Sequence, residues 1–152
     1  MVRKLALLFI GATFFLAPSS RVMAQTVTSM TITFATTSDD KDWNSQVRDR
    51  VVLNGQDVAT LFCCSSDRKS DHWLDHTGTS RQMTIISPIS KSNLHGCTFV
   101  VGMTAVGRDN WNFIPTLAVT YSDGSKEQWT YPETFLSSDN NEDKRQYSIP
   151  PS

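Results

Sequence analysis

The sequence predicts an all-β fold, an antiparallel β-sandwich of about seven to eight strands. Short segments of alternating apolar and polar residues recur every 8 to 15 residues, and almost no segment has a helical period. Asn54-Gly55 and Asp123-Gly124 are strong hairpin dipeptides between such segments. Together these three observations favour a sandwich over a helical or mixed fold.

The first half of the chain supplies three expected strands. In residues 28–35, Met30, Ile32 and Phe34 alternate with polar residues, which is typical of a half-buried strand. Residues 46–53 and 58–63 form the next two, joined through the turn at Asn54-Gly55. Residues 65–79 are polar and aperiodic, so we expect a long loop with a helical turn near Trp73.

The second half supplies the remaining strands. Residues 81–87 predict a strand, and residues 96–105 predict the clearest one because every second residue is apolar. Residues 116–121 and 126–131 flank the turn at Asp123-Gly124. Residues 137–152 are charged and poor in apolar residues, which indicates a flexible C-terminal tail.

The N-terminus predicts export. Arg3 and Lys4 precede an apolar run of 12 residues at 5–16, which is too short to span a bilayer as a helix. Small residues precede the expected cleavage after Ala24, as signal peptidase requires. The domains are therefore a signal peptide at 1–24, a sandwich at 25–136 and the tail, with a secreted or periplasmic location. A retained anchor or a buried helix is the alternative.

Charge narrows the class of partner. The expected mature chain holds all 15 acidic residues and 14 − 3 = 11 basic ones, so its net charge is 11 − 15 = −4. With no long basic patch, nucleic acid is excluded as a partner. The mature chain contains no segment that predicts a transmembrane helix.

Three cysteines are present, Cys63, Cys64 and Cys97. An oxidising compartment permits one disulfide and leaves one thiol. We expect Cys97 to pair with Cys63 or Cys64, because a bridge between adjacent residues closes a strained ring. Three free thiols, or Cys64 and Cys97 facing each other unbonded on neighbouring strands, are the alternatives.

The stretch TTSDDKDWNSQ at residues 36–46 concentrates acidic side chains. Asp40, Asp42 and Asn44 have a spacing that lets a loop direct three oxygen ligands toward one calcium ion. An EF-hand is excluded, because Ser45 and Val51 stand where its glycine and terminal acid belong. A calcium loop on a sandwich would need ligands from a second loop.

The second loop is GRDNWNF at residues 107–113, with Asp109 and Asn110 as further candidate ligands. If both loops lie at one end of the sandwich, their oxygens converge, and close carboxylates repel one another without a cation. The alternative is an ordinary turn, since Asp and Asn favour turns for backbone reasons.

Two tryptophans lie in these loops. We expect Trp111 to be buried as a plug in the end of the sandwich, because tryptophan is usually buried. Trp43 lies within a charged run, so it is either a second plug or an exposed contact to a partner.

The stretch DHWLDH at residues 71–76 suggests an enzyme as an alternative. His72 and His76 are four residues apart, yet the glutamate of a metalloprotease helix is missing. A zinc site would also need a third ligand. The alternative is that Trp73 and Leu74 anchor a polar loop to the core.

The order of these segments resembles the PLAT/LH2 family and its C2-like relatives. The similar parts are TTSDDKDWNSQVRDRVVLNGQ and GRDNWNFIPTLAVTYSDGS, within roughly residues 28–129. The resemblance implies an eight-stranded sandwich that binds lipid surfaces or protein partners, often with calcium at one end. It implies Asp39, Asp40, Asp42 and Asp109 as calcium ligands and Trp111 as a packing residue. The middle of the chain does not match, and Trp43 replaces a small residue.

The combined hypothesis is a secreted, non-enzymatic binding module with calcium at one end, where Trp43 contacts a protein or lipid surface. One alternative is a secreted hydrolase that uses His72 and His76. Another is a structural or adhesive subunit linked to a second chain through the odd cysteine.

Overall fold

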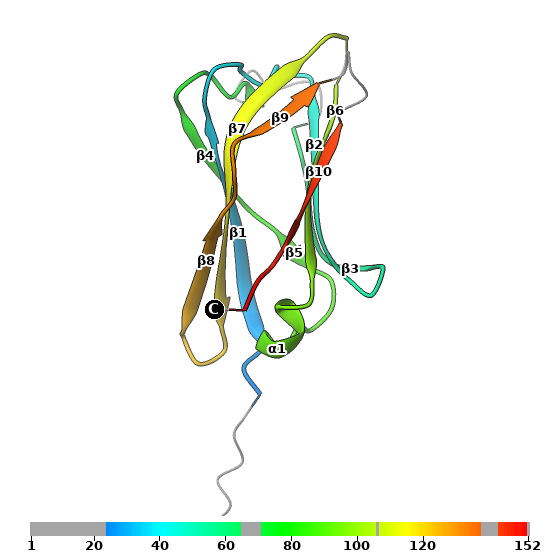
Figure 1. The fold of residues 1–152 in the computed structure, drawn as a ribbon, viewed down its shortest axis with the longest axis vertical. Coiled ribbons are helices and arrows are strands. Elements are labelled where there is room, and N and C mark those ends of the chain that lie inside the picture. Colours follow the sequence, from blue (N-terminus) through cyan, green and yellow to red (C-terminus); the bar gives the residue numbers. More distant parts are fainter. Residues whose placement is uncertain (1–23, 65–70, 106, 138–142, 152) are drawn as a thin grey trace, which may run out of the picture.

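Two antiparallel sheets of five strands each face one another in the computed structural model, which describes residues 24–64, 71–105, 107–137 and 143–151 (Figure 1). The all-β sandwich predicted from the sequence is thereby confirmed at the level of its two sheets. In the first sheet the order is β4 (Gly78–Gln82), β1 (Val27–Thr36), β7 (Asn110–Tyr121) and β8 (Lys126–Thr130), with β9 (Thr134–Ser137) also paired to β7. In the second it is β10 (Lys144–Ser148), β6 (Thr98–Thr104), β2 (Gln46–Leu53), β3 (Gln56–Cys63) and β5 (Thr84–Ile85).

The core lies between the sheets because the inward residues of the strands are apolar. Met30, Ile32 and Phe34 of β1 are fully buried, as their alternation predicts. On the facing sheet Phe99 and Val101 of β6 are buried in the same cluster. The described residues include one short helix, α1 (Lys91–Leu94), which lies at the lower end of the sandwich in Figure 1.

Strand β7 is longer than the sequence predicts. We expected a strand from residue 116, after Pro115, but the strand begins at Asn110. Pro115 lies where the neighbour of β7 changes from β9, at Phe113↔Thr134, to β8, at Thr116↔Thr130. A proline is tolerated at such a break, because the missing N–H removes no bond from a continuous ladder.

The prediction of a flexible tail over 137–152 is wrong for its last part. Lys144–Ser148 forms β10, which pairs with β6 along its whole length. Tyr147 stacks on Tyr131 with 4.5 Å between ring centroids, and Ile149 is only 1% exposed. These two apolar anchors, one on either side of Ser148, fix a segment whose other side chains are polar.

Two other segments also differ from expectation. The loop expected over 65–79 ends with strand β4, which begins at Gly78 and pairs with β1. Strand β9 was not predicted at all. The expected signal peptide falls on residues 1–23, which lie outside the described part of the chain. Within the described part, none of the helices is long and apolar enough to cross a membrane.

Candidate functional site

The end of the sandwich at the top of Figure 1 brings the predicted loops together. We call it the loop end and define it by residues 37–45, residues 71–77 and Asp109. Lys41 and Trp73 join the two loops, with each backbone N–H donating to the other carbonyl at 3.1 Å. Residues more than 30 positions apart in the sequence therefore form one hydrogen-bonded platform.

An aromatic cluster supports this platform from below. Phe34, Trp73, Trp111 and Phe113 have neighbouring ring centroids 3.8 to 5.5 Å apart. The indole N–H of Trp111 donates to Thr36 Oγ1 at 3.2 Å. Trp111 is fully buried, so its predicted role as a plug is confirmed. Aromatic packing of this kind stabilises the base of the loops.

Lys41 lies at the centre of the loop end and is fully buried. Its Nζ donates to the carbonyl oxygens of Asp42 at 2.7 Å and Ser45 at 2.8 Å. The same ammonium group lies 5.0 Å from the centroid of the Trp73 ring, a cation–π distance. No sequence pattern indicated this role, because a lysine among aspartates is usually solvated.

Burial lowers the pKa of Lys41 to about 8, and the attraction of Asp109, Asp71 and Asp42 only partly offsets that effect. Asp109 is 5% exposed, and its pKa is raised, first of all by burial. Its carboxylate accepts the backbone N–H of Asp42 at 3.3 Å, and this bond lowers the pKa. The surroundings of Lys41 and Asp109 are thus poorly solvated, and the positive charge of Lys41 compensates the nearby acids.

The other predicted calcium ligands make separate contacts. Asp39 accepts from the side chain of Asn112 at 3.3 Å, and Asp40 contacts His72. Asn110 is exposed at the start of β7, and Asn44 lies in the turn after Asp42. Among the described residues, no three His, Cys, Asp or Glu side chains form a group that could hold a metal ion.

These residues do not fit a calcium ion while Lys41 remains in place. The carbonyl groups of Asp42 and Ser45 are the kind of oxygen that calcium binds, but both accept hydrogen bonds from the ammonium group. Lys41 supplies the positive charge that the acidic loop needs. Calcium binding therefore stays a prediction, and the position of Lys41 argues against it.

Trp43 is presented outward by the turn that Lys41 holds from inside. Residues 42–45 close through the backbone N–H of Ser45, which donates to the Asp42 carbonyl at 3.2 Å. The side chain of Trp43 is 39% exposed, and Leu74 on the neighbouring loop is 54% exposed. A large aromatic side chain is thus exposed on a turn whose two ends are fixed.

The two histidines considered for catalysis lie in different surroundings. His72 is half-buried against Asp40, whereas His76 is exposed in a turn with φ of 57°. Arg81 lies 3.6 Å from Asp71 and 5.5 Å from the Trp73 ring, so this loop is fixed by an ion pair and a cation–π contact. Trp73 is buried and anchors the loop to the core as expected, but Leu74, the second expected anchor, is 54% exposed.

The expected pairing of Cys97 is wrong. Cys63 and Cys64 are bonded to each other, and Cys97 is a buried free thiol. Cys64 has a positive φ of 71°. Cys63 is level with Val47 and Met103, whereas Cys97 precedes the opposite end of β6, so the two cannot meet. Burial raises the pKa of Cys97 to about 11, which makes it a poor nucleophile.

A second polar cluster, at the helix end of the sandwich, was missed by sequence reasoning. Glu127 contacts Lys91 at 2.8 Å, His95 at 3.0 Å and the hydroxyl group of Tyr121. The residues are spread over α1, the residue after it, β7 and β8, so no local spacing in the sequence indicates the cluster. The pKa of Tyr121 is raised, first by burial and then by its contacts with Glu127.

Asp49 in β2 is fully buried, and no sequence pattern indicated this third feature. Its Oδ1 accepts the backbone N–H of Gly102 at 3.3 Å, while Oδ2 has no hydrogen-bond partner within the described residues. Burial raises the pKa of Asp49 well above its usual range. The core therefore disfavours the charged form of this carboxyl group.

Comparison with known proteins identifies no relative: no family model, no curated protein and no solved structure matches the chain. The geometry described above is therefore the whole basis for a function.

Proposed function

We propose that this chain is a non-enzymatic binding module that attaches to a protein surface through its loop end. The proposal rests on one observation, the exposed indole of Trp43 on a turn fixed from inside by Lys41. An aromatic residue held in place loses little conformational entropy on binding, and tryptophan is enriched at the centres of protein interfaces. Export through the predicted signal peptide is part of the same proposal.

Charge favours a protein over an anionic membrane. Asp39, Asp40 and Asp42 precede Trp43 in the sequence, while the one lysine among them is buried under the turn. Acidic residues at a surface are repelled by anionic lipid headgroups. A protein partner with a basic rim around an apolar pocket would match this end in both charge and chemistry. The resemblance to PLAT and C2-like domains belongs to this proposal and leaves lipid as the alternative outcome.

In the test, a photo-crosslinking amino acid is incorporated at position 43 of the protein, in the cells that produce it. The crosslinked protein is identified, purified and titrated with the wild-type chain, with Trp43→Ala and with Phe62→Ala. Phe62 is a matched control, because it is an apolar side chain 58% exposed on the outer face of β3. We expect Trp43→Ala to weaken binding by roughly thirtyfold or more, and Phe62→Ala to leave it unchanged.

Vesicles provide the alternative arm of the test. The chain is sedimented with vesicles of phosphatidylcholine alone and with added phosphatidylserine, and tryptophan fluorescence is compared between the wild-type chain and Trp43→Ala. We expect no binding to either kind. Vesicle binding that Trp43→Ala abolishes would make the partner a lipid surface instead of a protein surface. Equal losses of binding in Trp43→Ala and Phe62→Ala would show that the loop end is not the binding surface.

Calcium is tested separately by calorimetric unfolding in excess chelator and in millimolar calcium. A ligand that binds only the folded state raises the melting temperature. Because Lys41 fills the position of the cation, we expect no rise. A clear rise that disappears in Asp42→Ala would restore the calcium site predicted from the sequence.

A further inference from the structure

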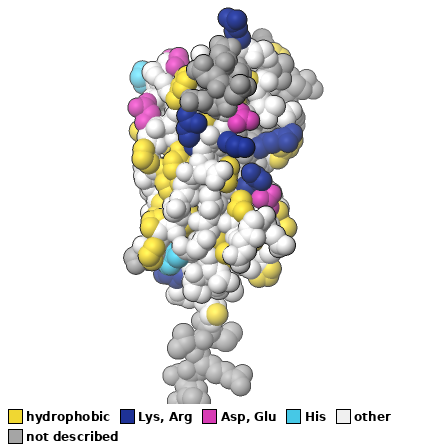
Figure 2. Space-filling view, turned by 45° about the vertical axis from the view of Figure 1, so that its right-hand side comes forward, with side chains coloured by type: hydrophobic (Ala, Val, Ile, Leu, Met, Phe, Trp, Pro, Cys, Tyr) yellow, Lys and Arg dark blue, Asp and Glu magenta, His cyan; other side chains and the backbone are white. Residues whose placement is uncertain are grey.

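The outer face of the second sheet contains a groove that the function proposed for the loop end does not use. Its volume is about 410 Å³, which is within the range of small-ligand sites. Figure 2 shows Lys and Arg side chains gathered across the upper part of the molecule in that view, with acidic side chains among them. The groove is lined by residues of β2, β3, β6 and the start of β10: Arg48, Arg50, Asp57, Val100, Gly102, Met103, Thr104, Asp143 and Lys144.

The floor of the groove is low because Gly102 has no side chain. A Cβ atom at this position would lie 2.9 Å from the carbonyl oxygen of Arg48, closer than real contacts allow. Asp49 binds the Gly102 N–H from the inner side and so keeps β2 and β6 together at this point. Val100, two residues away, adds an apolar patch to the floor and is 4% exposed.

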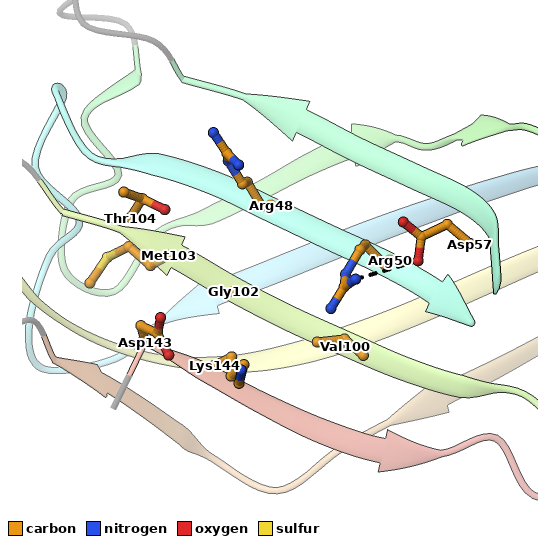
Figure 3. A pocket seen from close by; sticks show the side chains of 9 residues that line it. All are labelled: Arg48, Arg50, Asp57, Val100, Gly102, Met103, Thr104, Asp143 and Lys144. Carbon is orange, nitrogen blue, oxygen red and sulfur yellow. Dashed lines mark ion pairs between the residues drawn. The ribbon is translucent and has the colours of Figure 1, made fainter. Parts of the chain in front are cut away.

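Positively charged side chains flank this floor from both sides. Arg50 of β2 lies opposite Val100, and Lys144 of β10 lies opposite Gly102. Figure 3 shows Arg50 leaning toward β6, whereas Arg48 leans the other way, toward β3, where its guanidinium lies 5.0 Å from the Phe62 ring. Lys144 is exposed and makes no ion pair with any residue in the described part of the chain.

The charges of the groove are only partly neutralised. Arg50 contacts Asp57 through one N–O distance of 3.5 Å, and both side chains are more than a third exposed. Such an exposed pair is weak, so Arg50 can exchange it for a better acceptor. Three basic and two acidic residues line the groove. Because Arg48 leans toward β3, the cations beside the floor are Arg50 and Lys144.

We propose that this groove binds the oxyanion group of a small acidic ligand, a phosphate or a carboxylate, between Arg50 and Lys144 and above Gly102. Arg50 offers the forked donors that suit an oxyanion, and Lys144 adds a point charge from the other side. Asp57 competes with the ligand for Arg50. The proposal is independent of the loop end and of its partner.

The experiment is isothermal titration of the full mature chain at low salt with pyrophosphate and with citrate. We expect saturable binding of at least one of them. Tighter binding of pyrophosphate assigns the ligand to phosphates, and tighter binding of citrate assigns it to carboxylates. Arg50→Met and Lys144→Met should each weaken binding roughly ten- to hundredfold, the range for one charged hydrogen bond.

Two further variants make the test specific. Asp57→Asn should tighten binding, because it removes the competitor for Arg50 and one negative charge. Lys126→Met, an exposed lysine of β8 on the other sheet, is the matched control and should leave binding unchanged. All four positions are at the surface, and unchanged unfolding midpoints verify the fold. No saturable binding of either anion, or an equal loss in Lys126→Met, would overturn the proposal.

Discussion

Each end of the sandwich contains a lysine in cation–π contact with an aromatic ring, but the two lysines have different hydrogen-bonding partners. Lys41 at the loop end and Lys91 at the helix end both lie 5.0 Å from a ring centroid, that of Trp73 and that of Tyr121. Lys41 is fully buried and donates to neutral backbone carbonyl groups. Lys91 is 30% exposed in its side chain and faces the carboxylate of Glu127 at 2.8 Å.

The difference shows two ways in which a folded protein can accommodate a charged lysine side chain. A carboxylate cancels the charge of Lys91 directly, and solvent screens what remains. Carbonyl dipoles orient toward Lys41 but do not cancel its charge, so burial dominates and the pKa falls to about 8. The loop end therefore depends on one residue, whereas the helix end distributes its charges over several.

The largest expected effect comes from Lys41→Met. This variant leaves the carbonyl groups of Asp42 and Ser45 without their donor and the nearby acids without their cation. We expect the free energy of unfolding to fall by about 3–5 kcal/mol. Lys91→Met should lower it by only about 1 kcal/mol, because Lys91 is partly exposed and Glu127 keeps its other partners. Denaturant unfolding of both variants at neutral pH measures the contrast, and equal losses would remove it.

The pH dependence of stability sharpens the same contrast. Between the lowered pKa of Lys41, about 8, and its ordinary value of 10.5, the unfolded chain binds more protons at this residue than the folded chain. The contribution of Lys41 to stability therefore rises with pH across this window, by at most about 3 kcal/mol. The measurement is the difference in unfolding free energy between wild type and Lys41→Met, from pH 7.5 to 10. A difference that stays constant with pH would contradict the burial of the charge.

At the helix end the most informative variant is Glu127→Gln. It keeps the size of the side chain but removes the charge that Lys91 and His95 face. We expect a loss of about 2 kcal/mol in unfolding free energy, smaller than that of Lys41→Met. Chemical denaturation in low and high salt checks it, since the wild-type advantage should shrink as salt rises. A loss larger than that of Lys41→Met would reverse the comparison.

The smallest effect is expected for Trp43→Ala. The indole is 39% exposed and lies outside the turn that Lys41 holds, so stability should change by no more than about 0.5 kcal/mol. Thermal unfolding measures this, with Trp111→Ala as the contrast, where loss of a fully buried indole should cost about 3–5 kcal/mol. A large loss in Trp43→Ala would make this residue part of the scaffold rather than a binding surface.

Much of the fold could be read from the sequence where one face of a strand is consistently apolar. The alternation of Met30, Ile32 and Phe34 predicts β1 to within one or two residues. Strand β10 could not be found in this way, because most of its residues are polar and its anchors, Tyr147 and Ile149, depend on partners far away in the sequence. The edge position of β10 explains why polar side chains are acceptable there.

The candidate site was only partly predictable for the same reason. In the sequence, a meeting of loops 36–46 and 107–113 was only a condition of the calcium hypothesis. The hydrogen bonds between Asp42 and Asp109 and between Asp39 and Asn112 show that the two loops do meet. The role of Lys41 depends on Trp73, which lies 32 positions away and joins it only in the folded chain. Spacing alone shows which acids are close, but it does not show whether a metal ion or a lysine compensates them.

Strand β7 has one more consequence, for the order in which the molecule opens. On one side β7 pairs with β1. On its other side it pairs with β9 before Pro115 and with β8 after it, so most of β7 lies between two neighbouring strands. Releasing its amides means breaking two ladders at once, whereas β10 and β5 are each held by a single neighbour. In deuterium exchange β7 should therefore be protected up to global unfolding, while β5 and β10 exchange through local fraying.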